Sequence, residues 1–197
     1  MEHAFNLAHQ LSNFRERILI KKKLLCVVCG VFSLCSSVSA QESGYYAERG
    51  YSSLHSTSGD GLSYSPSVMR GIMGKKINSN FSVEGFLGFG LASGSTDMTG
   101  GSASLKVDNA YGLYLKPNYQ VNADVNVYTR IGFAKFNSTL TATNGLSEVE
   151  SLDGPSFGAG LSYKLDPRFS LNMDIMSYGN RDGSYVDGLT FGVGYKF

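Results

Sequence analysis

The sequence is poor in cysteine, proline and tryptophan, and each shortage excludes a class of protein. All three cysteines, Cys26, Cys29 and Cys35, lie near the N-terminus, so the rest of the chain can form neither a disulfide nor a cysteine metal site. Tryptophan, which soluble ligand-binding barrels usually employ, is absent. The chain has only four prolines beside 24 glycines, 12 tyrosines and 12 phenylalanines. This composition suits twisted strands joined by turns and disfavours long helices.

Long apolar runs are lacking too. The longest, from Leu24 to about Leu34, covers roughly a dozen residues, short of the roughly twenty that a transmembrane helix needs. Three lysines precede it, and Val38 and Ala40 occupy the two positions that a signal peptidase reads. We therefore expect residues 1–40 to be a signal peptide with an over-long N-terminal extension, cleaved after Ala40. Residues 41–197 are then one exported domain.

The chain also lacks an excess of charge of one sign. Of 17 Lys and Arg, five precede Gln41, and of 16 Asp and Glu, two do, which leaves the exported part with two more negative than positive side chains. So small an imbalance gives no electrostatic reason to expect a nucleic-acid partner. The acidic cluster Glu148, Glu150 and Asp153 could hold a divalent ion, but a solvated loop is the simpler interpretation, and we expect neither cofactor nor metal.

Apolar residues at every second position are the main positive signal. They form the C-terminal stripe Leu189, Phe191, Val193, Tyr195 and Phe197, which alternates with small or polar residues. Because successive side chains of a strand point to opposite faces, this pattern predicts a strand with one apolar face. The same period marks residues 81–92, 105–116, 125–134, 156–164 and 169–175, and poorer alternation marks 44–57 and 64–77. The total is about eight strands.

The connections alternate in length along the chain. Short joints at residues 76–81, 116–122 and 164–169 alternate with longer polar stretches at 58–62, 93–103, 137–154 and 179–188. This alternation predicts antiparallel hairpins with tight turns at one end and looser loops at the other.

Alternation alone does not say which face is dry, because a soluble up-and-down barrel has the same period. The positions between the apolar ones are largely Gly, Ala and Ser, which fit the interior of a narrow barrel better than a surface in water. A sheet in lipid must also close on itself to pair its backbone. We therefore predict an all-β fold, a closed antiparallel up-and-down transmembrane β-barrel of about eight strands, with termini and tight turns on the periplasmic side.

Residues 41–197 resemble the small outer-membrane β-barrel proteins of Gram-negative bacteria, the Ail/OmpX-like and opacity-type proteins. The resemblance is strongest over Tyr119–Phe136 and Ser156–Phe197. It implies a protein of the cell outer membrane, in contact with outer-membrane lipid and lipopolysaccharide. It also implies insertion by the barrel-assembly machinery, which reads the Leu189–Phe197 strand, with help from periplasmic chaperones. The family ranges from adhesins to envelope-stabilising proteins, so an extracellular ligand of the loops stays open.

Charged residues at interior positions are the candidate site. The face assignment turns a set of charges inward: Arg70, Glu84, Lys106, Asp108, Lys116, Arg130, Lys164, Asp174 and Lys196. Arg70, Glu84, Arg130 and Asp174 fall near mid-height, and isolated charges there are costly, so we expect them to pair as a plug. A selectivity constriction in a narrow pore is the alternative.

An enzyme is the third possibility, since some outer-membrane barrels modify lipid A with a serine–histidine pair. His55, with Ser56 and Ser58 beside it, is the only candidate, and adjacent residues of a strand point to opposite faces. A loop histidine among loop serines is the simpler interpretation. We therefore expect a non-enzymatic protein with a structural or cell-surface interaction role.

Overall fold

Eight long strands and two short ones make up the described part of the chain. The computed structural model describes residues 44–59, 61–98, 101–143, 145–181 and 183–197, so the expected signal peptide lies outside the described residues. The long strands are β1 (Tyr45–Thr57), β3 (Ser67–Lys76), β4 (Phe81–Ala92), β6 (Gly101–Gln120), β7 (Val125–Ala142), β8 (Ser147–Lys164), β9 (Phe169–Arg181) and β10 (Ser184–Lys196). The short strands β2 (Ser63–Tyr64) and β5 (Gly94–Met98) pair with β1 and β6.

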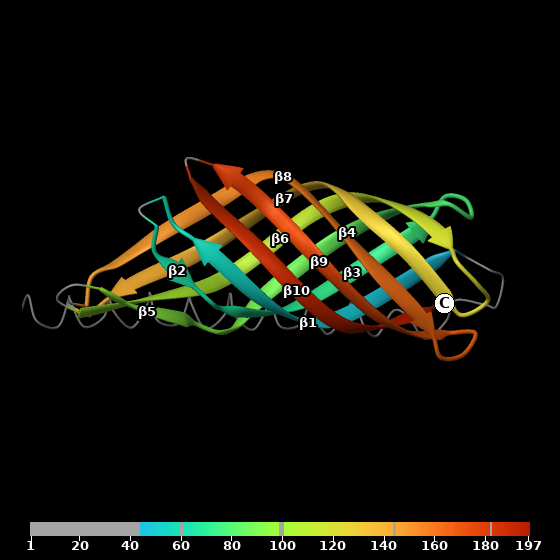
Figure 1. The fold of residues 1–197 in the computed structure, drawn as a ribbon, viewed down its shortest axis with the longest axis horizontal. Coiled ribbons are helices and arrows are strands. Elements are labelled where there is room, and N and C mark those ends of the chain that lie inside the picture. The colour runs from blue at the N-terminus through green and yellow to red at the C-terminus, as the bar shows by residue number, and fades with distance from the viewer. Residues whose placement is uncertain (1–43, 60, 99–100, 144, 182) are drawn as a thin grey trace, which may run out of the picture. The chain divides into compact units, whose positions relative to one another are not determined.

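The long strands form one closed antiparallel sheet. Each pairs with the long strand that follows it, and β1 pairs with β10 from Tyr46 opposite Lys196 to Thr57 opposite Tyr185. The prediction of a closed up-and-down β-barrel of eight strands is therefore confirmed (Figure 1). Within the described ranges, no helix is long and apolar enough to cross a membrane.

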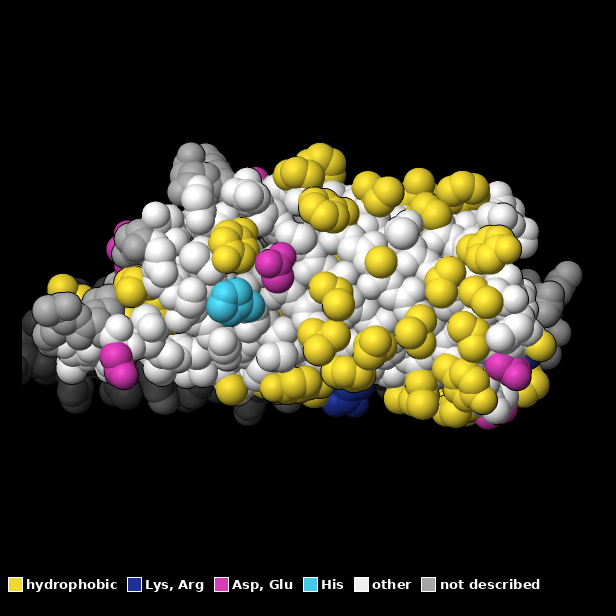
Figure 2. Space-filling view, in the orientation of Figure 1, with side chains coloured by type: hydrophobic (Ala, Val, Ile, Leu, Met, Phe, Trp, Pro, Cys, Tyr) yellow, Lys and Arg dark blue, Asp and Glu magenta, His cyan; other side chains and the backbone are white. Residues whose placement is uncertain are grey.

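Large apolar side chains cover the outside of the barrel. Leu113, Phe133, Phe157 and Ile175 are 69, 68, 62 and 62% exposed, although each lies mid-strand. In Figure 2 such side chains gather over the part of the barrel that ends at the C-terminus, while the opposite end shows mostly other residues. An apolar outer band of this kind is what a barrel presents to acyl chains.

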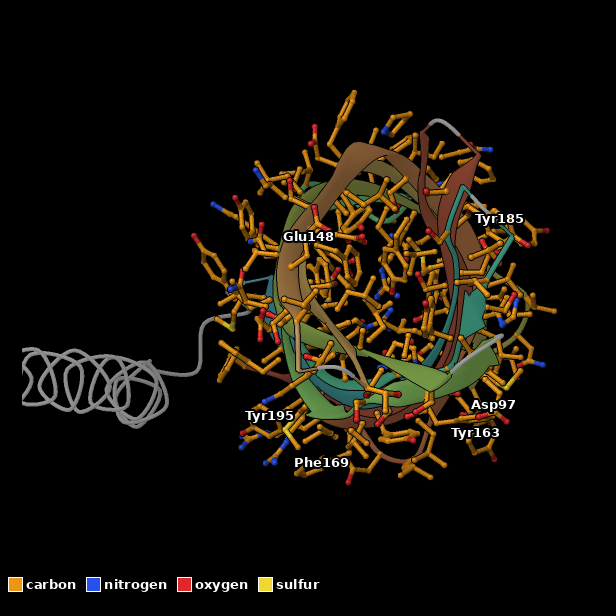
Figure 3. The ribbon with its side chains drawn as sticks, turned by 90° about the vertical axis from the view of Figure 1, so that its left-hand side faces the viewer. Asp97, Glu148, Tyr163, Phe169, Tyr185 and Tyr195 are labelled. Atoms are coloured by element: carbon orange, nitrogen blue, oxygen red, sulfur yellow. The ribbon has the colours of Figure 1, made fainter. Side chains whose placement is uncertain are left out.

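We call the end with the β3–β4, β6–β7 and β8–β9 turns the turn end, and the opposite end the loop end. At the turn end, Tyr163, Phe169 and Tyr195 project outward (Figure 3). The Tyr195 ring lies 5.1 Å from that of Phe169 and 5.2 Å from that of Phe197, between centroids. The Phe197 N–H donates to the Tyr45 carbonyl at 3.1 Å, which ties the end of the chain to the first strand.

The three tight turns share one hydrogen-bond pattern. The side chain of Asn78, Asn122 or Asp166 accepts hydrogen bonds from the backbone N–H groups two and three residues further on, at 2.7 to 2.9 Å. Asx side chains are favoured in turns for this reason. The backbone N–H groups of Phe169 and Arg168 lower the pKa of Asp166, because they stabilise its carboxylate.

At the loop end, the strands are longer than the sequence predicted. Most of residues 93–103, 137–154 and 179–188, predicted as loops, belongs to strands, and β7 continues to Ala142 before a turn closed by the Ala142 N–H to Leu146 carbonyl bond at 2.9 Å. Ladder pairing from Thr141–Ser147 to Asn137–Ser151 holds this hairpin together. Apart from Leu140, which packs against Tyr64, Ala103 and Leu105, the inner face of the extension is polar, so the alternation that marks a half-buried strand is missing there.

Two interior assignments on β6 are wrong. Lys106 and Asp108 were expected to point inward, yet both are exposed. Val107 pairs with Ser138 and Asn109 with Asn137, so Asp108 is an extra residue in a β-bulge. The bulge reverses which face each residue occupies, and it turns Leu105 and Val107 into the interior instead. Lys164 also differs, since its side chain is exposed at the turn end of β8.

Candidate functional site: a charge cluster across the lumen

Six charged side chains meet inside the barrel, and we call them the charge cluster. They come from six strands and each is at most 9% exposed: Glu48 (β1), Arg70 (β3), Glu84 (β4), Lys116 (β6), Arg130 (β7) and Asp174 (β9). Three are acids and three are bases, so the cluster is formally neutral. Burial of ionised groups is tolerated when they pair in this way.

Arg130 is the centre of the cluster. Its Nε donates to Glu84 Oε2 at 2.5 Å, its Nη1 to Asp174 Oδ2 at 2.6 Å and its Nη2 to Glu48 Oε2 at 2.7 Å. The strand that carries it, β7, lies opposite β1 in the closed order, so the contact with Glu48 spans the bore. One side chain therefore connects opposite walls.

Arg70 and Lys116 complete the pairing. Arg70 binds Asp174 through two parallel contacts, from Nη1 to Oδ1 at 2.8 Å and from Nη2 to Oδ2. Lys116 Nζ lies 2.8 Å from Glu48 Oε1 and 2.9 Å from Glu84 Oε1. Each acid thus has two basic partners, and bidentate arginine contacts add geometric specificity.

Tyrosines surround the cluster. Tyr46 donates to Glu84 Oε1 at 2.6 Å, Tyr128 donates to Asp174 Oδ2 at 3.2 Å, and Arg70 Nη1 donates to the Tyr178 hydroxyl at 3.1 Å. Lys116 Nζ also lies 4.2 Å from the centre of the Tyr128 ring. Such a fully hydrogen-bonded network is rigid and fixes one arrangement.

Small residues on the facing strands make room for these side chains. A Cβ on Gly160 would come within 2.6 Å of Tyr128 Cζ and 2.7 Å of Asp174 Cβ, and a Cβ on Gly74 would meet the Tyr46 ring. Gly74 and Gly160 are therefore required by close approach to the cluster.

An apolar layer lies between the charge cluster and the loop end. Phe86, Phe136 and Tyr178 pack there, with ring centroids 4.9 Å apart for Phe136 and Tyr178 and 5.9 Å for Phe86 and Tyr178. All three are buried within one core cluster. The interior is thus filled at two successive levels.

Residues 24–197 match the family model described as "Outer membrane protein beta-barrel domain". The chain belongs to this family. Solved structures agree on the fold. Ail of Yersinia pestis in complex with the heparin analogue sucrose octasulfate is 20% identical, with a TM-score of 0.57 over 78% of this chain and 97% of that one. Neisserial surface protein A is 18% identical, with a TM-score of 0.59 over 79% of this chain and 98% of that one. The N-terminal barrel of Pseudomonas aeruginosa OprF is 18% identical, with a TM-score of 0.53 over 80% of this chain and 100% of that one. No curated protein sequence matches the chain.

In this outer membrane protein beta-barrel domain, the four mid-height charges named from the sequence lie together. Arg70, Glu84, Arg130 and Asp174 are all buried and joined by ion pairs. Sequence reasoning missed Glu48, because the facing of the first strand was not assigned. The signal was present in the small residues Gly50 and Ser52, which follow Glu48 at a spacing of two.

The other candidate chemistry lies apart from the charge cluster. His55 is exposed on β1, opposite Asp187 on β10, with its ring centroid 6.4 Å from that of Tyr185. Across the part of the chain that the structure describes, no group of three or more His, Cys, Asp or Glu could hold a metal ion.

Proposed function

We propose that the protein is a non-conducting outer-membrane β-barrel with a structural or cell-surface interaction role. The observation that carries the proposal is Arg130, whose ion pairs join opposite walls of the lumen. An eight-stranded barrel is about filled by its side chains, and here a neutral cluster and an apolar layer lie one above the other.

The proposed orientation places the turn end in the periplasm and the loop end outside the cell. Two features support it: short turns at one end, and β6–β8 strands that run on at the other end. On this proposal the chain is exported through a cleaved signal peptide and inserted by the barrel-assembly machinery, which reads the stripe from Leu189 to Phe197. Outer-membrane lipid and lipopolysaccharide surround it.

Planar-bilayer recordings test the closed lumen. We expect no steady conductance from the native barrel. In Arg130→Ser the residue that spans the bore is lost while three carboxylates remain, so cation-selective openings should appear. Lys106→Ser, on the outside of β6, is the control and should stay silent. A steady native conductance whose ion selectivity reverses in Arg130→Glu contradicts the proposal and favours the narrow pore.

We also propose that the protein is not an enzyme. His55 is exposed on the outer face of β1, while its neighbour Ser56 lines a hollow at the loop end of the lumen, so the two side chains do not form a nucleophile–base pair. Lipid A from cells that overexpress the protein should show an unchanged mass spectrum. A new lipid A species that disappears in His55→Ala contradicts this expectation.

A further inference from the structure

A hollow of about 350 Å³ opens at the loop end of the lumen, the end that faces the viewer in Figure 3. We call it the loop-end cup. Strands from opposite sides of the barrel contribute its polar wall, through Ser56, Ser58, Ser138, Glu150, Ser151 and Ser184. Its volume lies at the lower end of the range of small-molecule pockets, about 300–1,000 Å³.

Hydroxyl groups dominate this wall. Among the described residues, none of the five serine hydroxyls has a hydrogen-bond partner within the protein, although all five side chains are at least partly exposed. A serine hydroxyl donates one hydrogen bond and accepts others, so it matches a ligand that carries hydroxyl groups of its own. Glu150 is the single charged residue of the lining that the structure describes, and no basic residue takes part.

The floor of the cup is closed and apolar. Phe136 and Val186 line it and belong to the apolar layer above the charge cluster, and Leu105 extends it toward β2. If the lumen is closed as proposed, a ligand in the cup leaves through the mouth by which it entered. The cup therefore has the form of a binding site and not of a transport path.

We propose that the loop-end cup binds a neutral sugar of about disaccharide size. Serine hydroxyls replace the water around sugar hydroxyls, and the leucine and valine side chains contact the apolar C–H face. Among the lining residues that the structure describes, a sulfated or phosphorylated ligand finds no cation, and an alkane would leave the serine hydroxyls without partners. A sugar site would supply a ligand class for the proposed cell-surface role. The proposal rests on that role only in one respect: the loop end must face the outside of the cell.

Two ligands with one scaffold test the proposal. Sucrose and sucrose octasulfate are titrated into the purified full barrel in zwitterionic micelles free of glycoside detergent, and amide chemical shifts are followed by NMR. We expect saturable shifts with sucrose for amides around the cup, and none there with the octasulfate. No saturable shift with sucrose, or equal shifts with both ligands, overturns the proposal.

Matched serine variants of β1 locate the site. Ser56→Phe fills the cup, whereas Ser53→Phe places the same ring on the outer wall, since Ser53 is exposed on the opposite face. Sucrose affinity should fall about tenfold or more in Ser56→Phe and stay within about twofold in Ser53→Phe. Ser184→Ala adds no bulk and serves as a second cup variant in case Ser56→Phe does not fold. It should weaken sucrose binding about threefold. Unchanged affinity in both cup variants contradicts the assignment. Conductance is recorded separately, so a failed sugar site leaves the closed lumen standing.

Discussion

Arg130 holds three carboxylates at once, so its removal should be among the most damaging single changes in the barrel. Arg130→Gln leaves Glu48, Glu84 and Asp174 buried with fewer cations, and breaking a buried ion pair from one side costs about 3–5 kcal/mol. Urea unfolding of the barrel in micelles, followed by circular dichroism, measures the loss. Lys106→Gln, on the outer face, should change the free energy of unfolding by less than about 0.5 kcal/mol. Equal effects from the two variants would contradict the role of the charge cluster.

Gly160 makes room for the cluster, and a single methyl group there should lower the free energy of unfolding. In Gly160→Ala the new Cβ meets Tyr128, Asp174 and the Met173 carbonyl at 2.6 to 2.7 Å, and overpacking of this kind costs about 1–3 kcal/mol. Gly85→Ala is the matched control on β4, since its Cβ would find no atom closer than 4.0 Å. The same unfolding experiment compares them. A stability of Gly160→Ala equal to that of Gly85→Ala argues against tight packing around Asp174.

At the residue scale, the sequence allowed the inward direction of a charge to be predicted wherever its strand alternates strictly. Arg130 and Asp174 lie in such strands, in which one face carries small or polar residues and the opposite face carries apolar ones. Glu48 does not, because Tyr46 and Tyr45 make both faces of the first strand look alike. The sequence predicted that Arg70, Glu84, Arg130 and Asp174 pair, but not which acid each base binds, since that depends on which strands stand opposite in the closed barrel.

The Asx turns belong to the scale of the element, and one of them should respond to pH. The pKa of Asp166 is lowered by two backbone N–H donors, so its ionised form stabilises the folded turn. This contribution is complete above the ordinary pKa of an aspartate and is lost as the pH falls through the lowered value. The Phe169 amide proton, followed by NMR, should therefore titrate with a midpoint below that ordinary pKa.

Asp166→Asn is the control that the protein itself provides, because Asn78 and Asn122 occupy the same place in the other two turns. The amide oxygen of Asn accepts both hydrogen bonds without titrating, so the Phe169 signal should become independent of acid pH. Asp166→Ala should shift the same signal at neutral pH. A midpoint at or above the ordinary value in the native protein is the contrary result.

The β6 bulge explains why the predicted facing of this strand was half right. Leu113 and Leu115 point outward as expected, but Leu105 and Val107 share their sequence parity and point inward. A period of two cannot reveal an inserted residue, because a bulge leaves each half of the strand regular.

Deletion of Asp108 should be tolerated for the same reason. Val107 already pairs with Ser138 and Asn109 with Asn137, so removal of the residue between them leaves a regular ladder with both halves facing as before. Deletion of Thr129, in the regular part of β7, should instead turn the remainder of that strand inside out and prevent folding. Heat-modifiable migration on gels reports the folded fraction. Loss of folding in both deletions contradicts the bulge.

For the whole molecule, the terminal phenylalanine has two separable contributions. Its ring packs against Tyr195 at the turn end, and its backbone N–H donates to the Tyr45 carbonyl at 3.1 Å. Phe197→Ala keeps the backbone bond and should lower the assembled fraction in cells while leaving in vitro stability almost unchanged. Deletion of Phe197 should reduce both. Equal assembly of the native and Phe197→Ala proteins in cells would remove the ring from the insertion signal.

Closure, strand number and the apolar outer wall were predictable because each follows from a repeating pattern and from the need to pair every backbone group in lipid. The lengths of the loop-end hairpins were not, because residues 137–142 and 147–151 carry no regular alternation of apolar residues. Polar composition alone does not separate a paired hairpin in water from a loop.

The distribution of the charge cluster over the strands also constrains the order of events during biogenesis. The β6–β7 hairpin carries Lys116 and Arg130, both cations, and their acidic partners arrive only with β1, β4 and β9. A hairpin entering hydrocarbon by itself would take two bare positive charges with it. Stepwise insertion of hairpins is therefore unfavourable for this chain, and we expect β1, β4 and β9 to be paired with the middle of the barrel before it leaves water.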